Sequence, residues 1–183
     1  MRLSARSRLA TVAVAVGDAL RRHGIRAVLT GGACASLYTA GKYQSRDMDF
    51  ILVGGTTQPR LDAAMTSVGF ARTGDRYVHP RVPFYVEFPR GPLAIGGDYQ
   101  IRPVTRSSRA GRTLALSATD SCRDRLAAFY HWNDRQSLQV AAWIGARHRV
   151  DLAHIRRWSD AEGFGRRFEE FLGEIRRARA GRR

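Results

Sequence analysis

Two adjacent glycines, Gly31 and Gly32, separate a short β-branched run from a helical pattern. Residues 25–29 predict a strand, and residues 33–40 predict a helix that begins at the glycine pair. Because glycine has no Cβ atom, the backbone can turn tightly there and approach a phosphate, and the helix N-terminus offers free N–H groups. Residues 47–53 then predict a second strand. This succession predicts an α/β sheet.

The remaining segments extend this pattern before and after the glycine pair. Residues 6–23 and 59–68 predict helices, while 77–78 and 84–88 predict strands. After an arginine-rich stretch and a short strand-like run, the chain becomes almost wholly helical. The arginine-rich stretch covers residues 102–112, and the strand-like run covers 113–116. The first helix after them has Thr119 or Asp120 as its N-cap and ends before Asn133. Further helices are predicted at 134–146, 151–161 and 164–178. We expect an α/β (α+β) core over residues 1–112 and a small helical C-terminal region over 113–183, packed on the core.

The composition narrows the class of protein. With 183 residues, 44% of them hydrophobic, the chain can bury a core, which excludes a disordered basic tail protein. Thirty arginines, one lysine and 16 acidic residues give a formal charge of +15, so we expect a polyanionic partner. The arginine-rich tail, residues 176–183, is interpreted as a solvated end, with RNA binding as the alternative.

Several features bear on the compartment. Cys34 and Cys122 have neither disulfide nor metal-site spacing, which favours a reducing cytoplasm. The apolar run 9–16 is as long as a signal-peptide core, but charged residues follow at once, so an amphipathic helix is favoured. No run approaches the ~20 apolar residues that span a bilayer, and no membrane partner is expected.

Asp47 and Asp49 are the strongest candidates for chemistry. Side chains two apart on a strand project from the same face, so the two carboxylates lie a few Å apart. Such a pair is costly unless a cation lies between the charges, and Mg²⁺ is the usual solution, with Mn²⁺ as a possible substitute. Glu87, between apolar neighbours in residues 84–88, is the candidate third carboxylate. The structural alternatives are turn caps or a strand-edge device for the Asp pair and an outward-facing residue for Glu87.

Together the glycine pair and the Asp-Met-Asp strand resemble the signature of the nucleotidyltransferase superfamily. Further along, Asp124-Arg125-Leu126-Ala127-Ala128 and Asn133-Asp134-Arg135 resemble the downstream motifs of AbiEii-like and MenT-type toxins of toxin–antitoxin systems. The resemblance implies a nucleotidyltransferase-like mixed β-sheet flanked by helices. It also implies metal binding by Asp47 and Asp49.

In this resemblance Arg125 falls where the family usually has lysine, and Asp134 falls at a later functional aspartate. Arginine keeps its charge, so Arg125 can bind a triphosphate but can hardly act as a base. Its alternative is a surface arginine paired with Asp124 or Ser121, and for Asp134 the alternative is a helix N-cap. Ser45 and Arg46 are candidates for nucleotide binding together with Gly31 and Gly32, and ordinary loop residues are their alternative. 

The implied activity is Mg²⁺-dependent transfer of a nucleoside monophosphate from an NTP, favouring a pyrimidine, to the 3′ acceptor end of tRNA, with release of pyrophosphate. Blocked aminoacylation makes such a protein a toxin, and a cognate antitoxin is its expected partner. Two alternatives remain: modification of a protein Ser or Tyr, as in an antitoxin, or a non-catalytic basic RNA-binding partner in a toxin–antitoxin pair.

Overall fold

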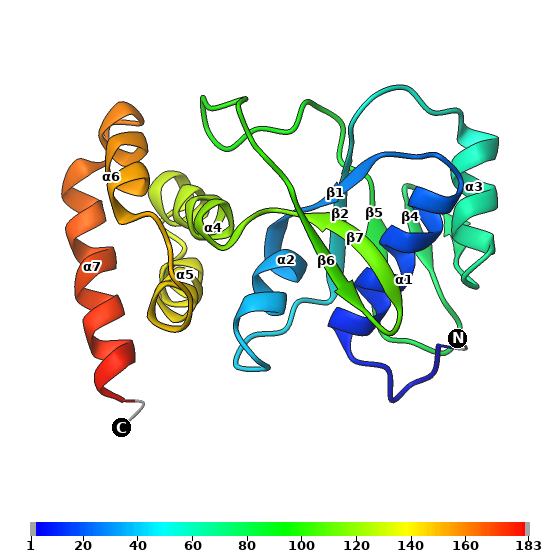
Figure 1. The fold of residues 1–183 in the computed structure, drawn as a ribbon, viewed down its shortest axis with the longest axis horizontal. Coiled ribbons are helices and arrows are strands. Elements are labelled where there is room, and N and C mark those ends of the chain that lie inside the picture. Colours follow the sequence, from blue (N-terminus) through cyan, green and yellow to red (C-terminus); the bar gives the residue numbers. More distant parts are fainter. Residues whose placement is uncertain (1–2, 182–183) are drawn as a thin grey trace.

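A single mixed β-sheet forms the centre of the computed structural model, which describes residues 3–181 (Figure 1). Its strands are β1 (Ala27–Leu29), β2 (Asp47–Leu52), β3 (Ala71–Thr73), β4 (Arg76–Val78), β5 (Tyr85–Glu87), β6 (Val104–Ser108) and β7 (Gly111–Ala115). They lie in the order β3-β4-β5-β2-β1-β7-β6. The pairs β1–β7 and β2–β5 are parallel and the other neighbours are antiparallel. The middle of the sheet therefore comes from β1, β2 and β5, whose sequences carry the candidate carboxylates.

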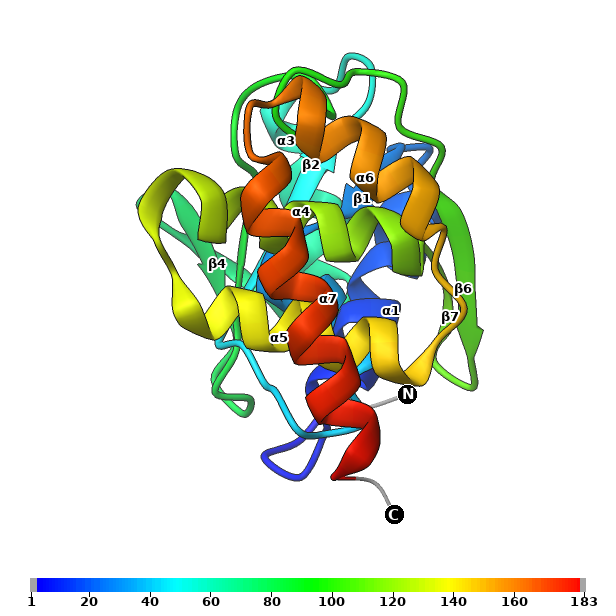
Figure 2. The same ribbon diagram turned by 90° about the vertical axis from the view of Figure 1, so that its left-hand side faces the viewer.

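Helices cover both faces of this sheet. They are α1 (Leu9–Arg22), α2 (Gly31–Tyr38), α3 (Gln58–Thr66), α4 (Ala118–Trp132), α5 (Arg135–Arg147), α6 (Leu152–Ala161) and α7 (Gly165–Ala180). In Figure 1, α1 and α3 lie on one side of the sheet, and α2 lies on the other side, between the sheet and α4–α7. Figure 2 shows the C-terminal helices stacked in front of the sheet. The expected mixed sheet with flanking helices and a C-terminal helical region is confirmed.

The apolar N-terminal run is part of this core. Leu9, Val12, Val16 and Leu20 recur at helical spacing in α1 and are buried against the sheet. The helix ends at Arg22, with His23 as its C-cap, and the next residue, Gly24, has a φ of +66° that favours glycine. Across residues 3–181 no helix has both the length and the apolar character needed to cross a bilayer.

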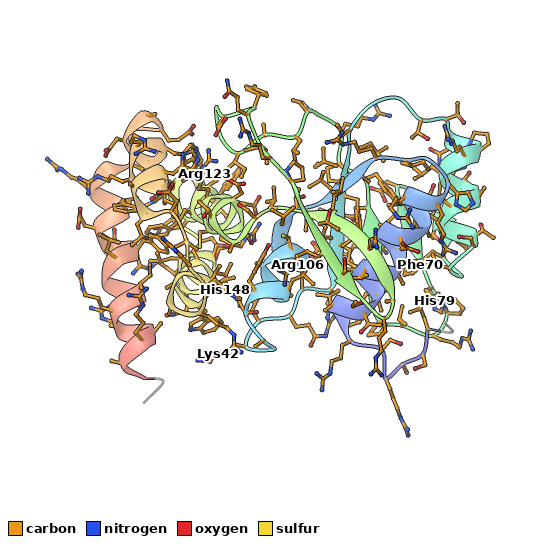
Figure 3. All side chains as sticks on the ribbon, in the orientation of Figure 1. Lys42, Phe70, His79, Arg106, Arg123 and His148 are labelled. Atoms are coloured by element: carbon orange, nitrogen blue, oxygen red, sulfur yellow. The ribbon has the colours of Figure 1, made fainter. Side chains whose placement is uncertain are left out.

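Tyr38, at the end of α2, links three parts of the fold. Its hydroxyl donates to the Leu116 carbonyl at 2.7 Å, and its own carbonyl lies 2.8 Å from Nε2 of His148, just after α5. The guanidinium of Arg106, on β6, lies 4.9 Å from the centre of its ring. Figure 3 labels Arg106 and His148 on either side of α2. These contacts fix α2, and with it the glycine turn at its start, relative to the sheet and the C-terminal helices.

Some expected boundaries differ from the structure. The N-cap of α4 is Ser117, not Thr119 or Asp120, because the Ser117 hydroxyl accepts from the Asp120 N–H at 3.0 Å. The arginine-rich stretch contains an unexpected strand, β6, which forms an antiparallel hairpin with β7. The boundary expected at residue 112 falls inside β7, which pairs with β1, so the sheet continues to Ala115. The strand β3 was also not expected, because its three residues are exposed and lack an apolar pattern.

The arginine-rich tail is helical in the part that the structure describes. Helix α7 continues to Ala180, where Arg179 donates to the Gly145 carbonyl at 3.2 Å. Arg182 and Arg183 lie outside the described residues.

Candidate active site

Three carboxylates meet on the face of the sheet on which α2 lies. Parallel pairing of β2 with β5 places Asp49 opposite Glu87, while Met48 and Phe50 alternate with the aspartates and are buried. One carboxylate oxygen from each of Asp47, Asp49 and Glu87 lies within 4.8 Å of the other two. We call these three residues the acidic cluster. The structure thus brings together the three carboxylates that the sequence singled out.

The acidic cluster is electrostatically unfavourable without a cation. Burial, followed by the charges of Asp47 and Glu87, raises the pKa of Asp49 to about 6. Arg125 acts in the opposite direction and lowers this pKa. Asp124 also raises this pKa, so the acidic cluster and Asp124 outnumber the one nearby arginine, and the site attracts further positive charge.

The glycine turn lies directly against the acidic cluster. Gly31 has a φ of +64°, and a Cβ atom there would lie 2.5 Å from Oδ2 of Asp49. A Cβ atom at Gly32 would lie 2.8 Å from both the Ser45 hydroxyl and the Tyr43 hydroxyl. The positive φ favours glycine at Gly31, and a side chain at Gly32 would have to displace the Ser45 and Tyr43 hydroxyls. The N-terminus of α2 therefore lies in close contact with two hydroxyls and with the carboxylate of Asp49.

Ser45 and Arg46, next to each other in the chain, differ in their relation to the acidic cluster. The Ser45 hydroxyl donates to Oδ1 of Asp47, so these two side chains lie on the same side. Arg46 lines a hollow of about 650 Å³ together with Ser45, Arg6 and Arg8. The structure brings Ser45 into contact with the acidic cluster, while a role of Arg46 in nucleotide binding stays a prediction.

Arg125 reaches the site from α4. Its guanidinium donates to Asp124 at 2.8 Å and to the Ser137 hydroxyl at 3.5 Å. Its side chain is 17% exposed, and its charge lowers the pKa of Asp49, so Arg125 lies within electrostatic range of the acidic cluster without a direct contact to it. Pairing with Asp124 matches the alternative considered from the sequence, whereas Ser121 is not a partner among its hydrogen bonds.

Asp134 does not contact the acidic cluster; it is connected to Arg125 through Ser137 and through its charge. Its carboxylate caps α5 by accepting from the N–H groups of Gln136 and Ser137, at 2.9 and 3.1 Å. The Ser137 hydroxyl donates to its other oxygen at 2.7 Å, and these hydrogen bonds lower the pKa of Asp134. Asp134 is not a member of the acidic cluster. A functional role for it stays a prediction.

Three residues near the acidic cluster were not singled out from the sequence. Tyr43 approaches Gly32, and Tyr85 pairs with Asp47 in the sheet. Burial and the charges of Asp47 and Glu87 raise the pKa of Tyr85. The guanidinium of Arg76 lies 4.9 Å from the centre of the Tyr85 ring. Tyr85 precedes Glu87 by two residues, so strand alternation could have predicted that the two side chains share a face. The positions of Tyr43 and Arg76 near the site depend on the tertiary structure and have no such signal in the sequence.

The sheet, the glycine turn and the acidic cluster together define a nucleotidyltransferase-like fold. A solved structure with a similar fold is the crystal structure of an antigenic nucleotidyltransferase-like protein from Paracoccidioides brasiliensis. The two share 15% sequence identity with a TM-score of 0.55, over 77% of this chain and 77% of that chain. No protein-family model matches this chain, and no curated protein matches it. The similarity therefore shows the fold, while the activity is argued from the site.

Proposed function

We propose that this chain is a metal-dependent nucleotidyltransferase that moves a nucleoside monophosphate from an NTP to the 3′ end of tRNA. The observation that carries the proposal is the acidic cluster lying against the glycine turn on a nucleotidyltransferase-like sheet. A phosphate-binding helix N-terminus beside three carboxylates suits a phosphate chain held with a divalent cation.

The residues present fit a divalent metal ion. All three carboxylates supply oxygen ligands, which Mg²⁺ and Mn²⁺ prefer, and their oxygens lie within 4.8 Å of one another. Gly31 leaves the approach to Asp49 free of a Cβ atom. Asp47 and Asp49 would hold the ion, and when bound it neutralises charge on the triphosphate and on the departing pyrophosphate.

The chain's own groups would then bind and orient the two substrates. Backbone N–H groups of the Gly31–Gly32 turn and the Tyr43 hydroxyl would donate to phosphate oxygens, and Arg125 would neutralise charge. The Ser45 hydroxyl, which donates to Asp47, would orient that carboxylate beside the nucleotide. Glu87 accepts the proton of the attacking hydroxyl. A bond forms between that oxygen and the α-phosphorus, while the bond from the α-phosphorus to the α–β bridging oxygen breaks and pyrophosphate leaves.

The choice of tRNA rests on charge and on the resemblance to AbiEii-like and MenT-type toxins. A chain of formal charge +15 attracts a polyanion such as an acceptor stem. The resemblance adds a pyrimidine NTP as donor, toxicity through blocked aminoacylation, and an antitoxin as partner. In this proposal Asp134 supports Arg125 through Ser137.

The test is incubation with Mg²⁺, each α-labelled NTP in turn, and either total tRNA or total protein. We expect label in tRNA, and the Asp49→Asn variant to lose about three orders of magnitude in rate because a metal ligand is gone. Asp160→Asn, which removes an exposed carboxylate on α6, is the matched control and retains the rate. Label in protein alone would overturn the tRNA acceptor, and no label in any combination would overturn the enzymatic function.

A further inference from the structure

A row of charged residues crosses three strands on the site face of the sheet. Asp49 on β2 pairs with Glu87 on β5, and Glu87 pairs in turn with Arg76 on β4. Directly paired side chains share a face, and neighbouring strands lie about 4.8 Å apart. Arg76 therefore stands one strand beyond Glu87, on the side away from the glycine turn.

Arg76 is not used to neutralise a carboxylate. It forms no salt bridge within residues 3–181, although Glu87 is its paired residue; instead its guanidinium lies over the ring of Tyr85. The residue is exposed, so it adds little to the stability of the core. An exposed arginine held in place by an aromatic ring, at the edge of an acidic site, is available for an anionic ligand.

The nearest hollow does not include Arg76. This hollow of about 520 Å³ is lined by Tyr77 and Arg72, which pair with each other in the sheet and so share the face opposite to Arg76. The ligand of Arg76 would therefore lie on the open surface of the sheet next to Glu87, where the guanidinium is held over the Tyr85 ring.

From this placement we infer that Arg76 binds the backbone phosphate next to the terminal nucleotide of a single-stranded nucleic acid acceptor, and that Tyr85 positions Arg76. This inference rests on the proposed function. In an in-line displacement the acceptor oxygen and the leaving pyrophosphate lie on opposite sides of the α-phosphorus. The glycine turn takes the donor phosphates, so the acceptor enters over β5 and β4. A protein hydroxyl acceptor would carry no phosphate for Arg76 to bind.

The first experiment measures binding without catalysis, by fluorescence anisotropy with a short labelled single-stranded RNA that ends in a 3′ hydroxyl. Arg76→Gln is expected to weaken binding about tenfold and to reduce the salt dependence by about one ion. Arg157→Gln is the matched control, since it removes the same charge from an exposed position on α6. Equal effects of the two variants would overturn the inference, because bulk charge alone would then explain binding.

The second experiment separates the two substrates kinetically. Arg76→Gln raises the KM for the RNA acceptor about tenfold and leaves the KM for the NTP within about twofold. Tyr85→Phe keeps the ring under Arg76 and stays near the wild type, whereas Tyr85→Leu behaves as Arg76→Gln does. A rise in the KM for the NTP alone would place the pair on the donor side and overturn the inference. If the wild-type chain transfers nothing, the proposed function fails, while the anisotropy experiment still decides whether Arg76 binds RNA.

Discussion

The two sides of α4 use arginine in opposite ways. Arg123 and Arg125 are two residues apart, which is about 200° around the helix axis. The side chain of Arg123 is 1% exposed and donates to Asp120 at 2.9 Å and to Asp98 at 2.5 Å. Its guanidinium also lies 5.1 Å from the centre of the Trp158 ring, where α4 faces α6 (Figure 3). Arg125 forms an ion pair with one carboxylate, that of Asp124, and its charge lowers the pKa of Asp49 in the acidic cluster.

The neighbours of each arginine account for the difference. Around Arg123, further hydrogen bonds fasten the segment between β5 and β6 to α6: Trp158 Nε1 donates to the Ile95 carbonyl at 3.2 Å, and the Gly97 N–H donates to Glu162 at 2.7 Å. This side of α4 is closed, and of the polar atoms of Arg123 only Nε lacks a hydrogen-bond partner within the described residues. The Arg125 side has an excess of carboxylates and borders the glycine turn. The net charge of the chain says nothing about this division.

The largest effect is expected on stability at Arg123. Replacing it by Met leaves Asp98 and Asp120 without their partner, at a cost of about 3 kcal/mol. The melting temperature should then fall by roughly 10 °C, as measured by circular dichroism. The remaining folded protein should transfer nucleotide at the wild-type rate, because Arg123 does not reach the acidic cluster.

The matched control is Arg157→Met, which removes an exposed arginine from the adjoining helix α6. Its melting temperature should stay within about 2 °C of the wild type. If Arg123→Met proved as stable as this control, the ion pairs of Arg123 with Asp98 and Asp120 would not stabilise the fold.

On the other side of α4 the effect falls on activity. Arg125→Gln removes a charge that offsets the carboxylates and the triphosphate, so kcat should fall about a hundredfold. Arg125→Lys keeps the charge and should retain most of kcat. Melting temperatures of both variants should remain near the wild type, since Arg125 is partly exposed and has one ionic partner. If the kcat of Arg125→Gln were unchanged, Arg125 would have a structural role only, as Arg123 has.

The sequence predicted the parts of the site that depend on local spacing. The glycine turn and the Asp-Met-Asp strand lie within 19 residues of each other, and strand alternation alone places Asp47 and Asp49 on one face. Glu87 was found by the same alternation. Strand alternation does not fix the direction of the Arg46 side chain, because Arg46 precedes β2, and its contact with the nucleotide stays a prediction.

The parts that could not be predicted depend on contacts between distant residues. Arg123 meets Asp98 and Trp158, which lie 25 and 35 positions away in the chain. The position of Arg76 beside Glu87 depends on the register of β4 with β5, which no local pattern fixes. Strand β6 was missed because its polar, arginine-bearing sequence resembles a solvent-exposed loop.

Removing a negative charge from the acidic cluster should stabilise the folded chain, whereas removing Arg123 should destabilise it. In the folded chain the raised pKa of Asp49, about 6, penalises its ionised form, and the unfolded chain has no such penalty. Without divalent metal, Asp49→Asn should therefore raise the free energy of unfolding by about 1 kcal/mol near pH 8. The gain should shrink as the pH falls from about 7 to about 4, because wild-type Asp49 then takes up a proton in the folded state.

Urea unfolding in the presence of a chelator, over that pH range, measures this difference. Asp160→Asn, on the exposed surface of α6, should show no such gain. A gain that is independent of pH would mean that repulsion within the acidic cluster is not its cause.

The smallest expected effect is on kcat at Asp134, where two substitutions distinguish its role as an N-cap from a role in activity. Asn is as good an N-cap as Asp, so Asp134→Asn should keep the stability of α5, whereas Asp134→Ala should lose about 1 kcal/mol. Both variants remove the charge behind Ser137 and Arg125. Asp134 acts on Arg125 through Ser137 and through its charge without direct contact. We therefore expect the kcat of Asp134→Asn to stay within about fivefold of the wild type, because such a coupling is worth about 1 kcal/mol or less. A hundredfold lower kcat of Asp134→Asn at unchanged melting temperature would instead show that the Asp134 charge is needed for activity, as that of Arg125 is expected to be.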